Sequence, residues 1–314
     1  MAQTVEVIPT VFPGEARQTF SSYLSRQWSI WSRKPFGIIG GVMIIFFVFL
    51  ALFAPLVAPY PARELAGGRL LPPSASFLLG TDSLGRDVLS RTIYGAQISI
   101  AAGLTATIIS VTIGTFLGVV SGYLGGWVDV IVQRCLEVLA SFPGLVLVLI
   151  MVSVLGRADA SSKNLVGIAW QLRPLELAIA VSFVFSVTRI IRSAVLKERN
   201  LPYIEAAHTL GVPTTRILWR HILPNVMPYV IVAFSSIIGS VILIEAALSF
   251  LGYGVAAGTP SWGIDLSARN REYFNVAPWL MLGPGVALSL TVLGYNFLGD
   301  ALRDILDPRL RGSR

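Results

Sequence analysis

Charged residues are scarce in this sequence. Asp, Glu, Lys and Arg make up 13% of its 314 residues, whereas 54% are hydrophobic. Soluble globular domains carry about 25% charged residues, so the composition indicates a membrane protein. Cys135 is the only cysteine, which excludes a disulfide framework and a metal site built on a CxxC pair.

Catalytic motifs are absent as well. His208 and His221 are the only histidines, and neither has a carboxylate or cysteine partner at metal-ligand spacing. GxSxG, HExxH and GxxxxGK[ST] do not occur. We therefore expect no catalytic residue, no metal site and no cofactor, and a membrane-embedded enzyme ranks lowest among the function classes. The net charge of +7 comes without a basic run interleaved with aromatics, so we expect no nucleic-acid binding.

Long uncharged runs are what the sequence has instead. A helix needs about 20 mostly apolar residues to cross a bilayer, and one charge at its centre costs about 2.5–3.5 kcal/mol. A further segment, Leu175–Leu196, has Glu176, Arg189 and Arg192 towards its ends, where long side chains can reach the headgroups; a buried amphipathic helix is the alternative there. We predict an all-α membrane protein with six transmembrane helices. The runs without Asp, Glu, Lys or Arg are 35–62, 92–128, 138–156, 226–244 and 273–299.

The distribution of basic residues orients these spans. Six spans place both termini on one side, and most of the 24 Lys and Arg residues lie in the tails and loops of that side. Because cytoplasmic loops are enriched in Lys and Arg, we expect a multi-pass protein of the cell (inner or plasma) membrane with both termini in the cytoplasm. The predicted divisions are an N-terminal tail (1–35), a first span with an external segment (36–97), a transmembrane core (98–299) and a C-terminal tail (300–314).

Three residues within the spans are candidates for a solute pathway or a gate. Pro143 should kink the third span, because proline cannot continue the helical hydrogen bonds. Glu245 is either an intramembrane carboxylate that faces protein or water, or a marker of the external end of its helix. Asn296 is a polar residue in the last span.

The external segment contains LGTDSLGRDVLSR, residues Leu79–Arg91. Thr81 or Asp82 can cap a short helix there, with Asp87 and Arg91 spaced i, i+4 along it. A capped surface helix and a role in receiving a solute or a binding protein both remain open.

Gly114, Gly118 and Gly122 form two overlapping GxxxG units in the second span. Such a smooth face lets another helix approach closely. We favour packing within the chain over a subunit interface.

A polar segment at 197–224 interrupts the apolar pattern. It forms a loop between two spans of the predicted transmembrane core. Asn200 can cap a helix, Pro202 fits its first turn and Gly211 stands where a left-handed terminator belongs. The pattern predicts a helix over Leu201–Leu210.

A second helix is expected from about Pro213 to Pro224, where the next span begins. In the first helix, Ala206 and Ala207 keep the surface slim and leave Glu205 as the one strong polar group. Such a helix could insert into a groove on another protein. The alternative is a helix lying on anionic lipid.

The spacing of this segment resembles the EAA loop of ABC importer permeases. His221 departs from the general pattern, which has an aliphatic residue there, but HILPN is usual in the peptide-importer branch. The residues that carry the resemblance, and that it assigns to coupling with an ATPase, are Glu205, Ala206, Ala207, Gly211, Leu223 and Pro224.

Most of the chain resembles the second, C-type, membrane subunit of the dipeptide/oligopeptide and nickel permeases. Gln97 and Glu137 stand where that branch commonly has Arg and Asp. The similar stretches are LGTDSLGRDVLSR, GYLGGWVD, ALSFLGYG, SWG and NFLGDALRDILDPRLR.

This resemblance implies a type I ABC importer permease with a cytoplasmic coupling helix. The chain would form half of the pathway for peptides or a related small solute. Implied partners are a homologous permease subunit in a heterodimer, two cytoplasmic ABC ATPases, an external binding protein and membrane lipid, with ATP hydrolysed by the ATPases. The alternative is an ion- or proton-coupled secondary transporter with Glu245 as coupling carboxylate; it predicts an inverted repeat with paired broken helices, and the sequence has no convincing duplication.

Overall fold

The computed structural model describes residues 34–155, 174–255 and 258–306. The regular secondary structure of this part is helical, apart from one isolated β-bridge between Thr81 and Asp87, so the all-α prediction is confirmed. The elements are α2 (Pro35–Leu52), α3 (Ala54–Val57), α4 (Val88–Leu124), α5 (Gly126–Ala140), α6 (Gly144–Leu155), α7 (Pro174–Glu198), α8 (Pro202–Thr209), α9 (Thr214–Ile217), the π-helix η1 (Leu218–Ile222), α10 (Leu223–Phe250), α11 (Trp262–Asp265), α12 (Ala268–Arg271) and α13 (Trp279–Leu306).

Five helical segments within the described residues are long and apolar enough to cross a membrane. The bent pair α5 and α6 makes a sixth if it counts as one span. The segment predicted at Leu175–Leu196 is among the five, as α7. The others are α2, α4, the continuous stretch Thr214–Phe250 and α13.

The third span differs from the simple kink that we expected. Its helix starts earlier, at Gly126, and stops at Ala140, and the next helix leaves at 91° from Gly144. Pro143 lies in the break, as the sequence predicted, but the chain forms two helices rather than one bent helix. A proline without an N–H and a following glycine, which has no side chain to restrict its backbone, favour such a break.

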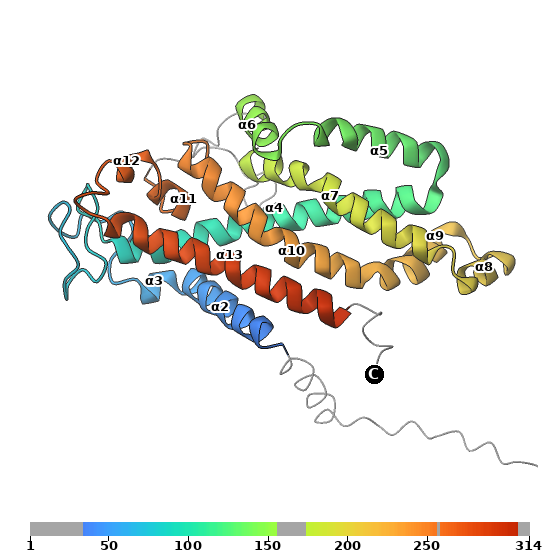
Figure 1. Ribbon diagram of the computed structural model, residues 1–314, viewed down its shortest axis with the longest axis horizontal. Coiled ribbons are helices and arrows are strands. Elements are labelled where there is room, and N and C mark those ends of the chain that lie inside the picture. Colours follow the sequence, from blue (N-terminus) through green and yellow to red (C-terminus); the bar gives the residue numbers. More distant parts are fainter. Residues whose placement is uncertain (1–33, 156–173, 256–257, 307–314) are drawn as a thin grey trace, which may run out of the picture.

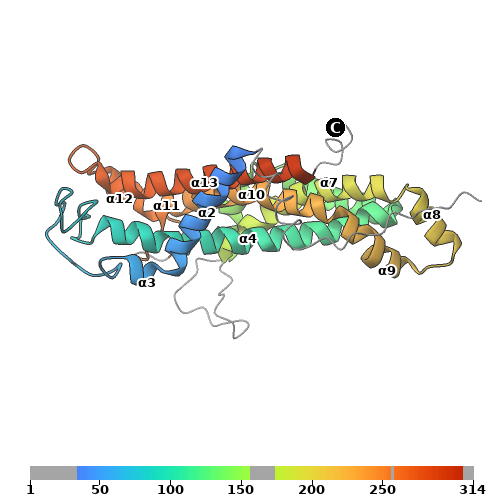
Figure 2. The same ribbon diagram turned by 90° about the horizontal axis from the view of Figure 1, so that it is seen from below.

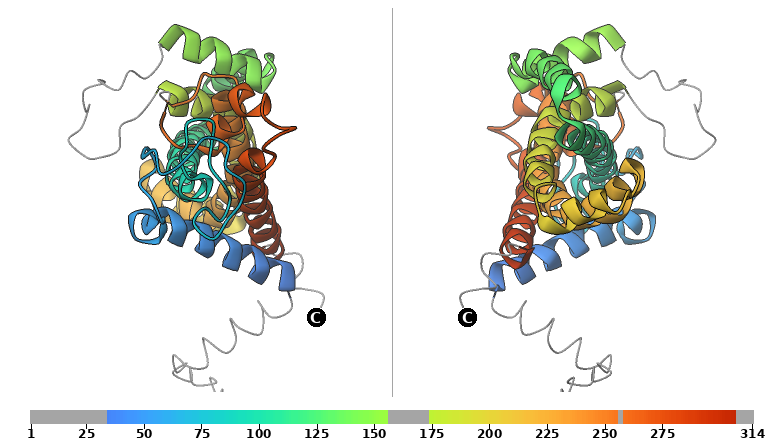
Figure 3. Two further views of the ribbon diagram at one scale, coloured as in Figure 1. Left: turned by 90° about the vertical axis from the view of Figure 1, so that its left-hand side faces the viewer. Right: turned by 90° about the vertical axis from the view of Figure 1, so that its right-hand side faces the viewer.

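The long helices form an elongated bundle whose two ends differ. Figures 1 and 2 show α10 between α7 and α13, with α4 running along the same axis. The segment before α4 lies at one end with α11 and α12, whereas α8 and α9 lie at the other. The end-on views in Figure 3 face these two ends in turn. The chain therefore presents two different surfaces beyond its spans.

Helix α4 packs against α7 along the predicted glycine face. A Cβ atom on Gly114 would lie 2.6 Å from Val187 Cβ, and one on Gly118 would lie 2.9 Å from Ile191 Cβ. Separations this short exclude any side chain larger than hydrogen. The GxxxG units are thus used within the chain, as we favoured.

The segment Leu79–Arg91, which we expected on the external side, is built differently from the capped short helix that the sequence suggested. Asp87, rather than Thr81 or Asp82, is the N-cap, and the helix that it caps is the 37-residue α4. Its Oδ2 accepts a hydrogen bond from the Ser90 backbone N–H at 2.8 Å. Because the Asp87 carboxylate turns to its own helix end, Arg91 pairs elsewhere, as described below.

Candidate functional site

The short helix α8 projects from one end of the bundle and faces the viewer in the right-hand view of Figure 3. It spans Pro202–Thr209, one residue shorter at each end than predicted. Pro202 occupies the first turn as expected, but the N-cap is Leu201, without a side-chain hydrogen bond. The prediction that Asn200 caps this helix is therefore wrong: Asn200 lies one residue too early, and the fixed φ of proline sets the start instead.

The C-terminal end of α8 is closed by a Schellman motif. The backbone N–H of Gly211 donates to His208 O at 2.9 Å, and that of Val212 donates to Ala207 O at 3.1 Å. Gly211 has φ +73°, the left-handed conformation that such a terminator requires, so this prediction is confirmed. A Cβ atom on Gly211 would meet nothing within 4 Å. The demand for glycine there is conformational rather than steric.

The two faces of α8 have different roles. Ile204 is 1% exposed and Ala207 is 7% exposed, and both pack in a hydrophobic cluster with Ile217 and Ile222. The two alanines therefore lie on opposite faces of α8: Ala207 is buried and Ala206 is exposed. On the outward face Glu205 is exposed and forms no ion pair within the described residues. The result is a firmly seated helix with one free carboxylate.

The segment after α8 does not break at Pro224, contrary to our expectation. Instead α9, η1 and α10 run on as one helical stretch, in which the Leu223 N–H bonds to Leu218 O five residues back. A π turn widens the helix, which gives room to a proline ring that would otherwise clash with the preceding turn. Leu223 lines an apolar cavity of about 410 Å³ between this stretch and α4. Leu223 and Pro224 thus belong to the base of the span rather than to α8.

The three candidate pathway residues lie on separate elements. Pro143 is exposed in the break between α5 and α6. Glu245 is fully buried near the C-terminal end of α10 and accepts a hydrogen bond from Ser249 Oγ at 2.8 Å. Asn296 is exposed on α13, with its Oδ1 3.2 Å from where a Cβ on Gly239 would lie. No hydrogen bond joins these three residues in the described part of the chain.

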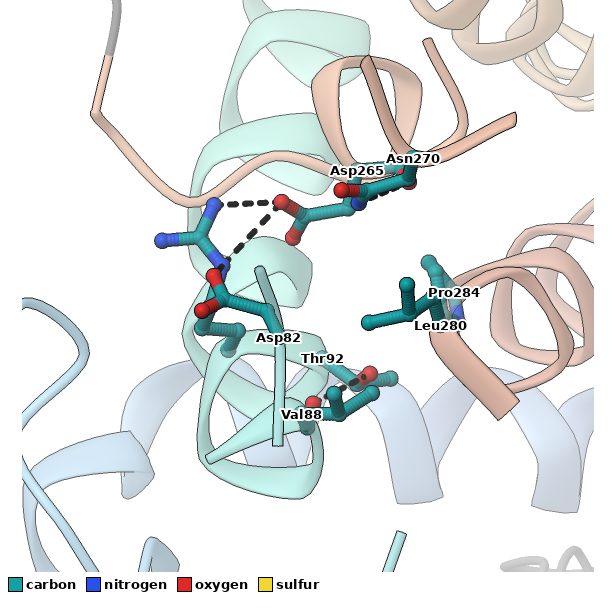
Figure 4. Close-up of a pocket in the computed structure, with 8 residues that line it drawn as sticks. Asp82, Val88, Thr92, Asp265, Asn270, Leu280 and Pro284 are labelled. Carbon is teal, nitrogen blue, oxygen red and sulfur yellow. Dashed lines mark hydrogen bonds and ion pairs between the residues drawn. The ribbon is translucent and has the colours of Figure 1, made fainter. Parts of the chain in front are cut away.

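A buried ion pair at the opposite end of the bundle was not anticipated from the sequence. Arg91 Nε lies 3.1 Å from Asp265 Oδ1, and Asp82 Oδ2 lies 3.9 Å from the same nitrogen (Figure 4). The Arg91 and Asp265 side chains are 4% and 8% exposed. The cavity beside them is about 10 Å³, room for at most one water molecule. This cluster therefore fastens α11 to α4 and is too small to hold a solute.

Comparison with known proteins gives two family matches. Residues 114–312 match the family described as binding-protein-dependent transport system inner membrane component. Residues 22–73 match the N-terminal TM domain of oligopeptide transport permease C.

Individual relatives match over nearly the whole chain. The chain is 36% identical to the dipeptide transport system permease protein DppC of Alkalihalophilus pseudofirmus, over 96% of this chain and 95% of the relative. It is 36% identical to the glutathione transport system permease protein GsiD of Pectobacterium atrosepticum, over 90% of each chain. It is 40% identical to the probable peptide ABC transporter permease protein y4tQ of Sinorhizobium fredii, over 90% of this chain and 92% of the relative.

Proposed function

Because this chain belongs to the family of binding-protein-dependent transport system inner membrane components, we propose that it forms half of the pathway by which peptides or related small solutes enter the cell. Membership makes the chain a multi-pass, non-catalytic permease subunit of an ABC importer. Such an importer works with an ATPase and a solute-binding protein. The solute class rests on relatives named for dipeptide, glutathione and peptide transport.

The observation that carries the mechanism is the exposed face of α8. This helix is anchored by Ile204 and Ala207, and it presents Glu205 and Ala206 to the outside of the chain. In our proposal this face docks in a groove of a cytoplasmic ATPase, with Gly211 fixing where the helix ends. Leu223 and Pro224 connect the same segment to α10. Closure of the ATPases would move α8 and rock the spans between two states.

The complete importer in this proposal contains four further proteins. A homologous permease would supply the other half of the pathway as a heterodimer partner, two ATPases would bind on the α8 side, and a binding protein would deliver solute to the opposite end. Pro143, Glu245 and Asn296 stay candidates for the pathway or its gate. Of these, Asn296 has the best support, because an exposed amide at membrane depth is costly against lipid and favours contact with water, solute or a second permease.

The function is tested by uptake with purified components in proteoliposomes. We expect accumulation of a peptide only when ATP, the two ATPases, the partner permease and the loaded binding protein are all present. The competing secondary transporter would instead accumulate solute from an imposed ion gradient without ATP. Its expected paired broken helices also find little support, since the described residues contain a single sharply bent helix pair.

We further propose that both termini and α8 face the cytoplasm. The ion pair between Lys34 Nζ and Asp304 Oδ2, 2.5 Å long, supports a common side for the start of α2 and the end of α13; the tails before and beyond these helices lie largely outside the described residues. In a Cys135→Ser background, Ser76→Cys should react with an impermeant thiol reagent added to intact cells, and Thr209→Cys only after lysis. Both native side chains are exposed, so burial does not limit the reaction. The reversed pattern would overturn the orientation.

A further inference from the structure

The C-terminal half of α8 is tied to α4 by an aromatic pair. Tyr123, in the last turn of α4, and His208 of α8 are joined by a hydrogen bond of 2.9 Å between Oη and Nε2. Their ring centroids are 6.2 Å apart and their ring planes are 13° from parallel. We refer to Tyr123 and His208 as the α4 contact. It connects two residues that lie 85 positions apart in the sequence.

The N-terminal half of α8 is tied to two other spans through one hydroxyl group. Tyr203 Oη donates to Glu198 Oε1 at the end of α7, at 2.5 Å, and accepts from Asn225 Nδ2 at the start of α10, at 2.8 Å. We refer to these three residues as the α7/α10 contact. Burial, together with the bond to the Glu198 carboxylate, raises the pKa of Tyr203 to about 12. The hydroxyl therefore keeps the proton that it donates throughout the physiological pH range.

The residue that links α4 to α7 completes this arrangement. Arg199, directly after α7, donates from one guanidinium nitrogen to Gly122 O at 2.9 Å and to Tyr123 O at 3.3 Å. The ends of α4 and α7 are thereby held to each other beside the glycine seam. A displacement of α8 that reaches one of these helices would reach both.

We propose that movement of α8 is passed to the spans through the α4 contact and the α7/α10 contact. Tyr123, His208 and Tyr203 then act as positioning residues that couple ATP hydrolysis to uptake. This inference rests on the proposed function of α8. The exposed Glu205 and Ala206 lie between Tyr203 and His208, on a helix of 8 residues. A force applied to that face is shared between the two contacts.

Hydrogen bonds suit this task better than the apolar contacts of Ile204 and Ala207. Hydrophobic packing is non-directional, so it can hold α8 against the bundle while the helix slides or rotates. A hydrogen bond weakens steeply with distance and angle, so the two contacts fix the position of each half of α8. Deleting one hydroxyl should therefore loosen the link without unseating the helix.

The α4 contact is tested with three variants in the assembled importer. Tyr123→Phe removes the hydroxyl, His208→Phe keeps an aromatic ring but removes Nε2, and His208→Gln keeps a side-chain amide near that position. The readout is solute taken up per ATP hydrolysed in proteoliposomes. We expect both phenylalanine variants to lower this ratio about two- to tenfold, the factor for loss of one ordinary hydrogen bond. His208→Gln should recover most of it, and Tyr123→Phe/His208→Phe should be no worse than either single variant, because the same bond is lost.

The α7/α10 contact is tested by Tyr203→Phe, with Tyr60→Phe as the matched control. Tyr60 Oη also donates a hydrogen bond, to Ser76 O at 3.3 Å, but in the segment at the opposite end of the bundle. Tyr203→Phe should lower uptake per ATP as the α4 variants do, and combined with Tyr123→Phe the reductions should multiply. Tyr60→Phe should leave the ratio unchanged.

Three outcomes would overturn the inference. In the first, the parent importer shows ATP-driven uptake and all the tyrosine variants have the same uptake per ATP as the parent. The proposed function would then stand and the positioning role would fail. The second is a fall of uptake and ATP hydrolysis in the same proportion at an unchanged yield of assembled importer, so that uptake per ATP equals that of the parent. The third is an equal loss in His208→Gln and His208→Phe. A parent without ATP-driven uptake would instead contradict the proposed function itself.

Discussion

Gly211→Val should reduce ATP-driven uptake at least tenfold while the chain still inserts in the membrane. Gly211 holds φ at +73°, which costs a non-glycine residue about 1–2 kcal/mol and makes a β-branched residue a genuine outlier. The strain falls on the Schellman bonds to Ala207 and His208 that close α8. Since about 1.4 kcal/mol corresponds to a tenfold change in an equilibrium, this strain should raise the unfolded fraction of the helix end by about tenfold. The measurement is uptake in proteoliposomes beside insertion and yield.

Two further variants separate backbone strain from contact with the ATPase. Gly211→Asn should retain most of the uptake, because asparagine tolerates the left-handed conformation and a Cβ atom at that position meets nothing within 4 Å. Glu205→Lys reverses the exposed charge of α8 without touching its buried face, and should lower both uptake and co-purification of the ATPases. Capture of solute by the external binding protein should be unaffected in all three. Normal uptake in both Gly211→Val and Glu205→Lys would reduce α8 to an interfacial anchor.

Arg91→Met should have the largest effect on the folded state. The Arg91–Asp265 pair is almost completely buried, and removing one partner of such a pair leaves an uncompensated charge at a cost of about 3–5 kcal/mol. Asp82 keeps its ion pair with Arg86 at 2.6 Å, so the uncompensated charge in this variant is that of Asp265. We expect a large drop in the yield of folded protein and in the thermal unfolding temperature in detergent.

The matched control breaks an exposed ion pair of the same chemistry. Arg134 and Glu137 are 2.8 Å apart, with side chains 78% and 53% exposed, and such pairs contribute about 1 kcal/mol or less. Arg134→Met should therefore leave the unfolding temperature close to that of the parent. Arg91→Met/Asp265→Leu should recover part of the loss, because replacing a whole buried pair with apolar side chains is often neutral. Equal stabilities of Arg91→Met and Arg134→Met would show that the buried pair does not stabilise the packing of α11 on α4.

The sequence alone determined the features that depend on local physics. Uncharged runs long enough for a bilayer identify the spans, because a charge within them is costly wherever the chain folds. Gly211 and Pro202 mark the ends of α8 because backbone sterics act on single residues. The EAA spacing led to the family that the comparisons show. The sequence also predicted a change of helix direction at Pro143. It did not predict the angle of 91°, which depends on what the two helices pack against.

Only the tertiary structure decided which side chains meet. Arg91 and Asp87 have the spacing of a helical ion pair, yet Asp87 caps α4 and Arg91 pairs with Asp265, 174 positions away. The bond between Tyr123 and His208 likewise requires α4 and α8 to end at the same place. Helical periodicity tells which face of a helix is apolar, but not which helix covers that face or at what depth. Polar side chains choose their partners only after this packing is set, because a buried charge or hydroxyl is stabilised by whatever group the neighbouring helix brings within reach.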